Sequence, residues 1–226
     1  GIGMGAVFVE LLPLIVGAAV LPVWIVMTLF LLRSERGVWK ASAFVAGATA
    51  VRLVQGAMFG FVFERAGDDG GGETSIIAAT LLLVAGIAML ITAVKKWRKE
   101  EDPDAPPPKW MAALQGLSVA KALGIGALLM ALALKQWVFT LSAIAIIENA
   151  GVGLGPSVAA FVLFVVGAQL LVAAPIVAYA IAPAATGKVL DTAQGWLTRY
   201  ERVILTSVSF VFGLWFLWKG ITGLLG

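Results

Sequence analysis

The chain has 226 residues, 61% of them hydrophobic and 13% charged, and its mean hydropathy is +0.99. Soluble domains are typically about 45–50% apolar and about 25% charged, so this composition excludes an ordinary soluble protein. Cysteine and histidine are absent, which excludes disulfides, the usual zinc sites and histidine catalysis, and a net charge of +3 carried between apolar runs argues against a nucleic-acid partner.

Six apolar stretches follow one another along the chain, each close to or above the ~20 residues that a helix needs to cross the hydrocarbon layer. The first is longer than the apolar part of a signal peptide, so we expect it to be retained as a span. The predicted fold is an all-α membrane protein with six transmembrane helices. The stretches cover residues 7–32, 39–63, 75–94, 117–147, 156–182 and 203–218.

A polar segment rich in proline divides the chain near its middle. Three spans on each side of it place the second half upside down relative to the first, as in transporters built from inverted repeats. We predict a first three-helix repeat, a cytoplasmic linker and a second three-helix repeat at residues 1–96, 97–110 and 111–226, respectively.

Lysine and arginine collect on one side of this predicted bundle, as they do on the cytoplasmic side of membrane proteins. The first, third and fifth connections carry eleven of the sixteen basic residues. The second connection, between residues 64 and 73, is mainly acidic. We therefore expect both termini to lie outside. A segment at 188–199, with Trp196, is predicted to be an amphipathic helix on the membrane surface or an ordinary loop helix.

The first span of each half is interrupted at its middle, by Pro22 in one half and by Lys135 and Gln136 in the other. Proline frees backbone groups that protein or water must satisfy, and we interpret Pro22 and Pro175 as helix breaks or hinges that suit alternating access. A half-helix beginning at Pro22 would present backbone donors that favour a negative ligand.

Arg52 lies near the middle of the second span, and Lys135 lies well inside the fourth. A charge at the centre of a span costs about 2.5–3.5 kcal/mol, and such residues usually face a polar cavity or a partner. The nearest acids are Glu10 and Glu148, at the predicted outer ends of their spans, which are candidates for charge pairing or proton coupling. If they do not reach, the two cations form an anion site; if they do, the cations only hold the bundle together.

Gln55, Gln136 and Gln169 also lie within spans, where each could line a pathway or bond neighbouring helices. Gly56 and Gly60 form a small-xxx-small pattern that fits close packing within the chain or a homodimer seam. No catalytic residue, metal site or cofactor is predicted, and we expect no enzyme activity. The Ser-x-x-Lys spacing from Ser118 has no companion hydrolase motif.

Five segments, in this order and spacing, resemble the GAP/Sap family, the sulfolipid- and glycopeptidolipid-addressing proteins of actinobacteria within the lysine-exporter superfamily. The family pattern in span four is similar to Asn-Pro-Lys-Asn; here Leu134 stands where the proline would be, which argues against a sharp break at this point. The segments are "LPVWIVMTLFLLRSERGVWKASAFVAGA", "PPKWMAALQGLS", "ALALKQWVFTLSAIAIIENAGVG", "FVLFVVGAQLLVAAPIVAYAIAP" and "VLDTAQGWLTRYERVI".

The resemblance implies a protein of the bacterial plasma (inner) membrane that assists export of lipids or small solutes. Together with the deep cations it predicts a transporter that moves an anionic lipid or glycolipid toward the outer leaflet, with Arg52, Lys135, Gln136, Gln55 and Gln169 in contact with the substrate. The alternatives are an exporter of small solutes of amino-acid type and a non-transporting accessory subunit. Membrane lipids and a lipid-export machinery are the expected partners.

Overall fold

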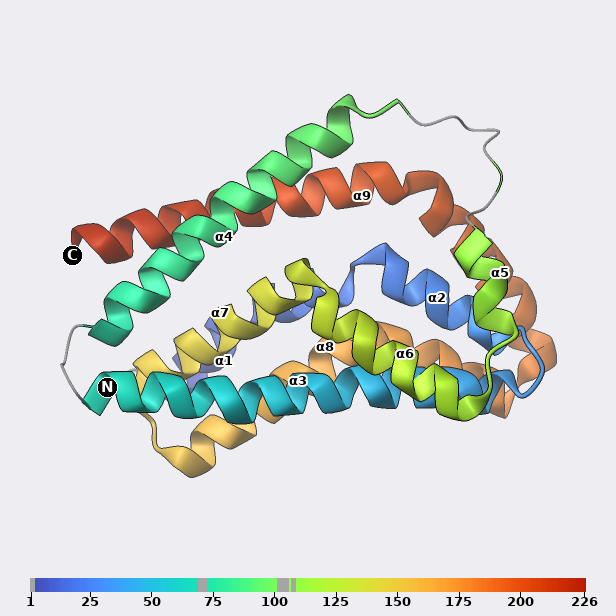
Figure 1. Ribbon diagram of the computed structural model, residues 1–226, viewed down its shortest axis with the longest axis horizontal. Coiled ribbons are helices and arrows are strands. Elements are labelled where there is room, and N and C mark those ends of the chain that lie inside the picture. Colours follow the sequence, from blue (N-terminus) through green and yellow to red (C-terminus); the bar gives the residue numbers. More distant parts are fainter. Residues whose placement is uncertain (1–2, 69–72, 101–105, 107–108) are drawn as a thin grey trace.

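The structure is a computed structural model that describes residues 3–68, 73–100, 106 and 109–226 (Figure 1). Every element assigned in these ranges is a helix. Much of the predicted linker, residues 101–105 and 107–108, lies outside the described residues. The elements are α1 (Met4–Ala19), α2 (Pro22–Leu32), α3 (Gly37–Asp68), α4 (Glu73–Arg98), α5 (Lys109–Gln115), α6 (Val119–Leu132), α7 (Leu134–Ala150), α8 (Leu154–Ile181) and α9 (Pro183–Leu225).

Four helices are individually long and apolar enough to cross a membrane: they are Gly37–Phe61, Ile76–Arg98, Leu154–Ile181 and Pro183–Leu225. Two further pairs pass the same test jointly, α1 with α2 and α6 with α7, and are bent by 54° and 71°. These four to six candidate spans confirm an all-helical, multi-pass membrane protein. Residues 188–199 do not form a separate helix, because α9 continues from them into the last span.

The break between α1 and α2 follows from local chemistry. Leu21 has an extended backbone and Pro22 occupies the first position of α2. Proline is well suited to that position because its ring presets φ and no backbone N–H is needed there. The interruption predicted at Pro22 is therefore confirmed.

The break between α6 and α7 is the sharper of the two, although the chain has no proline there. Ala133 is extended (φ −78°, ψ 94°), and the indole of Trp137 folds back to donate a hydrogen bond to the carbonyl of Ala131 at 2.6 Å. This bond satisfies a carbonyl that the end of α6 would otherwise leave unpaired. The expectation that the missing proline argues against a sharp break was wrong, because a side-chain donor stabilises the bend.

Glycines bring α3 and α6 into backbone contact. A Cβ at Gly47 would lie 2.1 Å from the carbonyl oxygen of Leu123, and one at Gly126 would lie 2.0 Å from that of Phe44. Only glycine permits so close an approach, which is a common device between membrane helices.

A second close pair consists of α4 and α9, which cross at the top of Figure 1. A Cβ at Gly86 would lie 2.5 Å from the backbone nitrogen of Leu217, and one at Gly220 would lie equally near that of Leu83. Arg202 of α9 donates a hydrogen bond to the carbonyl of Lys96, close to the end of α4, at 3.1 Å. The other long helices lie below this pair in Figure 1 and pack against it, since the ring centroids of Phe139 in α7 and Phe212 in α9 are 5.1 Å apart.

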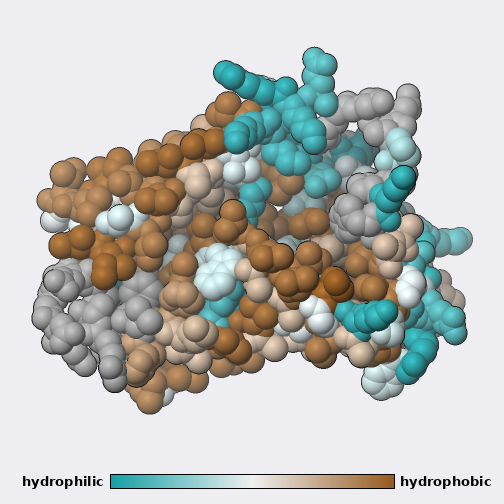
Figure 2. Space-filling view, viewed as in Figure 1, coloured by the Kyte–Doolittle hydropathy of each residue, from teal (hydrophilic) through white to brown (hydrophobic). Residues whose placement is uncertain are grey.

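Hydrophobic side chains cover most of the face shown in Figure 2, and hydrophilic ones gather at one end, around α5 and the end of α4. Large apolar residues stay exposed on several spans, among them Val84 at 59% and Val166 at 57%. Such a belt is what contact with lipid tails requires, whereas a soluble monomer rarely exposes so much contiguous apolar surface.

Candidate functional site

Arg52 of α3 is fully buried, with an exposed fraction of 0%. One of its terminal nitrogens donates a hydrogen bond to Oγ1 of Thr140 at 3.0 Å, and the other donates to Oε1 of Gln136. Its guanidinium carbon lies 5.9 Å from the ring centroid of Phe164. A side chain from α3 is therefore held by α7 on one side and by an aromatic ring of α8 on the other.

Gln136 connects this arginine to the break in the first span. It lies in the first turn of α7, and its Nε2 donates a hydrogen bond to the carbonyl of Ala18, in the last turn of α1, at 3.3 Å. The final carbonyls of a helix have no partner within that helix. One amide side chain thus joins the end of α1 to the guanidinium, at the place where the two broken spans meet.

Among the described residues no acidic side chain pairs with Arg52. The ion pairs there include Glu10 with Lys219 at 3.3 Å and Arg33 with Asp191, and neither involves Arg52. The sequence left open whether Glu10 neutralises a deep cation, and in the structure its partner is Lys219. Arg52 is held by neutral groups, so its positive charge is stabilised but not cancelled.

Three buried polar atoms near this point lack a hydrogen-bond partner among the described residues. They are Nε of Arg52 and both amide atoms of Gln55, which is only 3% exposed. Buried polar groups in proteins are nearly always hydrogen-bonded. The Arg52 cluster, which we define as Arg52, Gln55, Gln136 and Thr140, therefore has donors and an acceptor to offer a ligand.

The other predicted site residues lie around this cluster. Gln169 of α8 donates a hydrogen bond to Oγ1 of Thr49 at 3.0 Å, about one turn before Arg52, and so links α8 to α3. Lys135 is half-buried and makes no hydrogen bond or ion pair within the described part of the chain. The charged groups acting on its ammonium are Lys96 and Glu201, in α4 and α9. The structure thus directs the neighbours Lys135 and Gln136 toward different parts of the bundle.

The two prolines predicted to break or bend helices, Pro22 and Pro175, occupy different positions in their helices. Pro22 begins α2, whereas α8 continues unbroken through Pro175. Ser118 is the N-cap of α6, where its hydroxyl accepts a hydrogen bond from the backbone N–H of Lys121 at 3.2 Å. The Ser-x-x-Lys spacing therefore has a capping role here.

Sequence reasoning missed two members of the site. Thr140 lies four residues after Gln136, and this spacing places both on one face of α7. That signal was available. No sequence signal indicated Phe164, which packs on the guanidinium, because an apolar span contains several phenylalanines and nothing in the sequence distinguishes this one.

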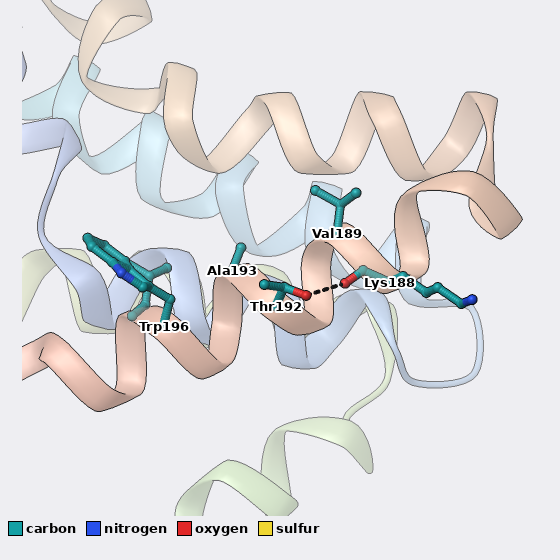
Figure 3. A pocket seen from close by; sticks show the side chains of 6 residues that line it. Lys188, Val189, Thr192, Ala193 and Trp196 are labelled. Atoms are coloured by element: carbon teal, nitrogen blue, oxygen red, sulfur yellow. Dashed lines mark hydrogen bonds between the residues drawn. The ribbon is translucent and has the colours of Figure 1, made fainter.

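The hollows on the described part of the chain include the following two. One, of about 390 Å³, lies between α3, α7 and α8 and includes Glu148 in its wall. The other, of about 600 Å³, follows the first turns of α9 and is lined by Lys188, Val189, Thr192, Ala193, Trp196 and Leu197 (Figure 3). In Figure 3 the hydroxyl of Thr192 bonds the carbonyl of Lys188 at 3.0 Å, and the lysine side chain extends away from Trp196. The polar groups of this second hollow are therefore used by the helix or directed elsewhere.

The apolar spans and the buried polar cluster define a multi-pass, all-α membrane protein. Within that class, the chain matches the model of the Sap, sulfolipid-1-addressing protein, family over residues 11–222. It belongs to this family, as the resemblance had indicated. No curated protein and no solved structure matches the chain.

Proposed function

We propose that this protein is an exporter that moves an anionic lipid or glycolipid from the inner toward the outer leaflet of a bacterial plasma membrane. The observation that carries the proposal is the buried guanidinium of Arg52, which has amide and hydroxyl partners but no carboxylate. The negative head group of the lipid would bind to the Arg52 cluster. Membership of a lipid-addressing family supports the choice of a lipid.

The energetics favour an anionic ligand. A cation at the centre of a span costs about 2.5–3.5 kcal/mol, a cost that polar partners reduce and an opposite charge reduces further. Arginine also presents its donors as a planar fork, which matches the oxygens of phosphate, sulfate or carboxylate groups. A bound anion would accept hydrogen bonds from Nε of Arg52 and Nε2 of Gln55, two donors that have no partner among the described residues.

The arrangement of elements supports two inverted halves, with both termini outside. Each half begins with a bent pair, α1 with α2 and α6 with α7, and continues with two long helices. In inverted-repeat transporters such broken helices carry the substrate site at the midplane. The Arg52 cluster would lie at that place, because Gln136 connects the start of α7 to the end of α1, beside the two breaks.

The test compares lipid retention by the full-length protein and two variants in native mass spectrometry. The panel pairs phosphatidylglycerol with phosphatidylcholine of the same chains. We expect Arg52→Gln to lose the preference for phosphatidylglycerol, and Arg52→Lys to keep part of it because the charge remains. Unchanged preference in Arg52→Gln, with normal helicity by circular dichroism, would overturn the head-group assignment.

An exporter of small anionic solutes is the second candidate, and the full burial of Arg52 favours it, because a small solute needs an enclosed polar site. Transport assays in vesicles separate the two candidates. Movement of a labelled anionic lipid between leaflets supports the lipid exporter, whereas release of an anionic amino acid without lipid movement supports the solute exporter.

A further inference from the structure

The hollow between α3, α7 and α8 is an elongated groove with an apolar wall. Gly56 and Gly60 of α3 form its floor, and it holds about 390 Å³. A Cβ on Gly60 would have only Oε1 of Glu148 within 4 Å, at 3.9 Å, so this glycine leaves space open. The walls come from α7 and α8, and include Ile144, Glu148, Ser157 and Phe161.

The groove runs along α3 from the residue after Arg52 toward the end that lies near the α7–α8 turn. On α3 its lining extends from Leu53 to Phe61, a rise of about 12 Å at ~1.5 Å per residue. Half of a hydrocarbon layer is about 15 Å thick. The groove therefore spans the depth of one leaflet, the one on the side of the α7–α8 turn, which the proposed orientation makes the outer leaflet.

The rim of the groove belongs to candidate membrane-spanning helices and is exposed, so lipid tails would surround it in a membrane. Leu53, Phe61 and Val158 are 45%, 54% and 54% exposed, respectively. The polarity changes along the groove: the deep part is apolar, and Glu148 and Ser157 lie at the surface end, in the last turn of α7 and the first turn of α8. An amphiphile has the same order of groups, with a chain below and ester or hydroxyl groups above.

Phe161 separates the groove from the Arg52 cluster. Its ring fills the space over Gly56, where a Cβ would lie 2.2 Å from the ring, and its centroid is 6.1 Å from that of Phe164, which packs on Arg52. Gly56 therefore serves packing within the chain, and Gly60 remains open to the groove. The rings of Phe161 and Phe164 thus lie between the groove and the guanidinium of Arg52.

We propose that this groove binds one acyl chain of a lipid in the outer leaflet and that Phe161 is the gate between the chain site and the Arg52 cluster. The inference rests on the proposed function in treating that lipid as the cargo. The chain would lie in the apolar part over Gly60, and the hydroxyl of Ser157 would donate a hydrogen bond to an ester carbonyl.

The first measurement uses the unmodified full-length protein in vesicles of phosphatidylcholine and phosphatidylglycerol. A phosphatidylcholine with a diazirine on one chain is photolysed, and the labelled residues are mapped by mass spectrometry. We expect label to concentrate on residues 53–61 and 154–162, above equally exposed residues such as Val84 of α4. Labelling spread evenly over the belt would overturn the inference.

The second measurement fills the groove. Gly60→Phe places a ring in it, and Gly124→Phe is the matched control, because a Cβ at Gly124, on the exposed face of α6, meets nothing within 4 Å. We expect Gly60→Phe to lower groove labelling to the level of other exposed residues such as Val84, because the ring occupies the space of the chain, and Gly124→Phe to leave it unchanged. Equal effects in the two variants would contradict the proposal. If Gly60→Phe does not fold, the map of the unmodified protein decides.

Two further outcomes separate the hypotheses. The groove could instead be the contact surface of a homodimer. Absence of label in the groove, together with disulfide crosslinking of two copies in a Gly60→Cys variant, would show this and overturn the acyl-chain site. Arg52→Gln is expected to leave the map of the neutral probe unchanged. If the head-group assignment fails, Arg52→Gln keeps the lipid preference while the groove is still labelled. If the groove assignment fails, the labelling is even while Arg52→Gln still loses the preference.

Discussion

The Arg52 cluster and the Glu10–Lys219 pair solve the same problem, a cation within membrane-spanning helices, in different ways. Lys219 of α9 is 3.3 Å from Glu10 of α1 and 5.0 Å from the ring centroid of Trp215, and the two charged side chains are 24% and 38% exposed. Arg52 is fully buried and is held by an amide and a hydroxyl. A carboxylate cancels the charge in one region, and neutral groups preserve it in the other.

The presence or absence of a carboxylate partner determines which of the two cations can bind an anionic ligand. A partly exposed ion pair contributes about 0–1 kcal/mol and offers a ligand little, because both charges are already satisfied. A guanidinium held by neutral oxygens keeps its electrostatic attraction, which is stronger away from water. Changes in the two regions should therefore have effects of different kinds and sizes.

The largest effect is expected from Gln136→Leu, which removes the acceptor of Arg52 and the donor to Ala18 together. Leaving a buried group unpaired costs about 1–3 kcal/mol, and more when it is charged. We expect the free energy of unfolding to fall by about 3 kcal/mol, measured by thermal or denaturant unfolding in detergent. A loss comparable to that of an exposed substitution would show that the amide is not structurally important.

Gln136→Glu sharpens the comparison, because it converts the Arg52 cluster into an ion pair like that of Glu10 and Lys219. The acceptor oxygen is kept, so stability should remain much closer to the unmodified protein than in Gln136→Leu. The preference for phosphatidylglycerol over phosphatidylcholine should nevertheless disappear in native mass spectrometry, because the charge is now cancelled. Retained preference would mean that the charge of Arg52 is not what selects the lipid.

An intermediate effect is expected from Lys135→Gln. Its ammonium is half-buried, outside the Arg52 cluster and near Lys96 and Glu201. We expect the preference for phosphatidylglycerol to weaken, but by less than in Arg52→Gln, measured with the same lipid pair. A loss equal to that of Arg52→Gln would place both cations in one site and remove the distinction between them.

The smallest effect is expected from Glu10→Gln and Lys219→Gln. Each should change the free energy of unfolding by less than about 1 kcal/mol, because the pair is partly exposed and screened. The single variants, the double variant and unfolding at low and high salt give the coupling energy directly. Loss of lipid preference in either variant would show that this pair takes part in the site.

Several features of the site were predictable from local sequence. A charged residue at the middle of an apolar run indicates a polar site, and Pro22 indicates a break, because both depend on the properties of single residues. The sharpness of the bend at Ala133 was not predictable in this way, although an interruption was predicted at Lys135 and Gln136. The bend depends on the hydrogen bond from the indole of Trp137 to the carbonyl of Ala131, six residues earlier. That bond forms only when the backbone turns between the two residues, and no pattern in the sequence indicates it.

The sequence by itself determined the environment of the protein and the depth of its polar residues, because the hydrophobic effect and the thickness of a bilayer act on every segment independently of the others. Only the tertiary structure decided the partners: Glu10 with Lys219, Gln136 with both Ala18 and Arg52, and Lys135 apart from Gln136. Hydrogen bonds and ion pairs act over a few ångströms, and these distances are set by how the helices pack, not by their order along the chain.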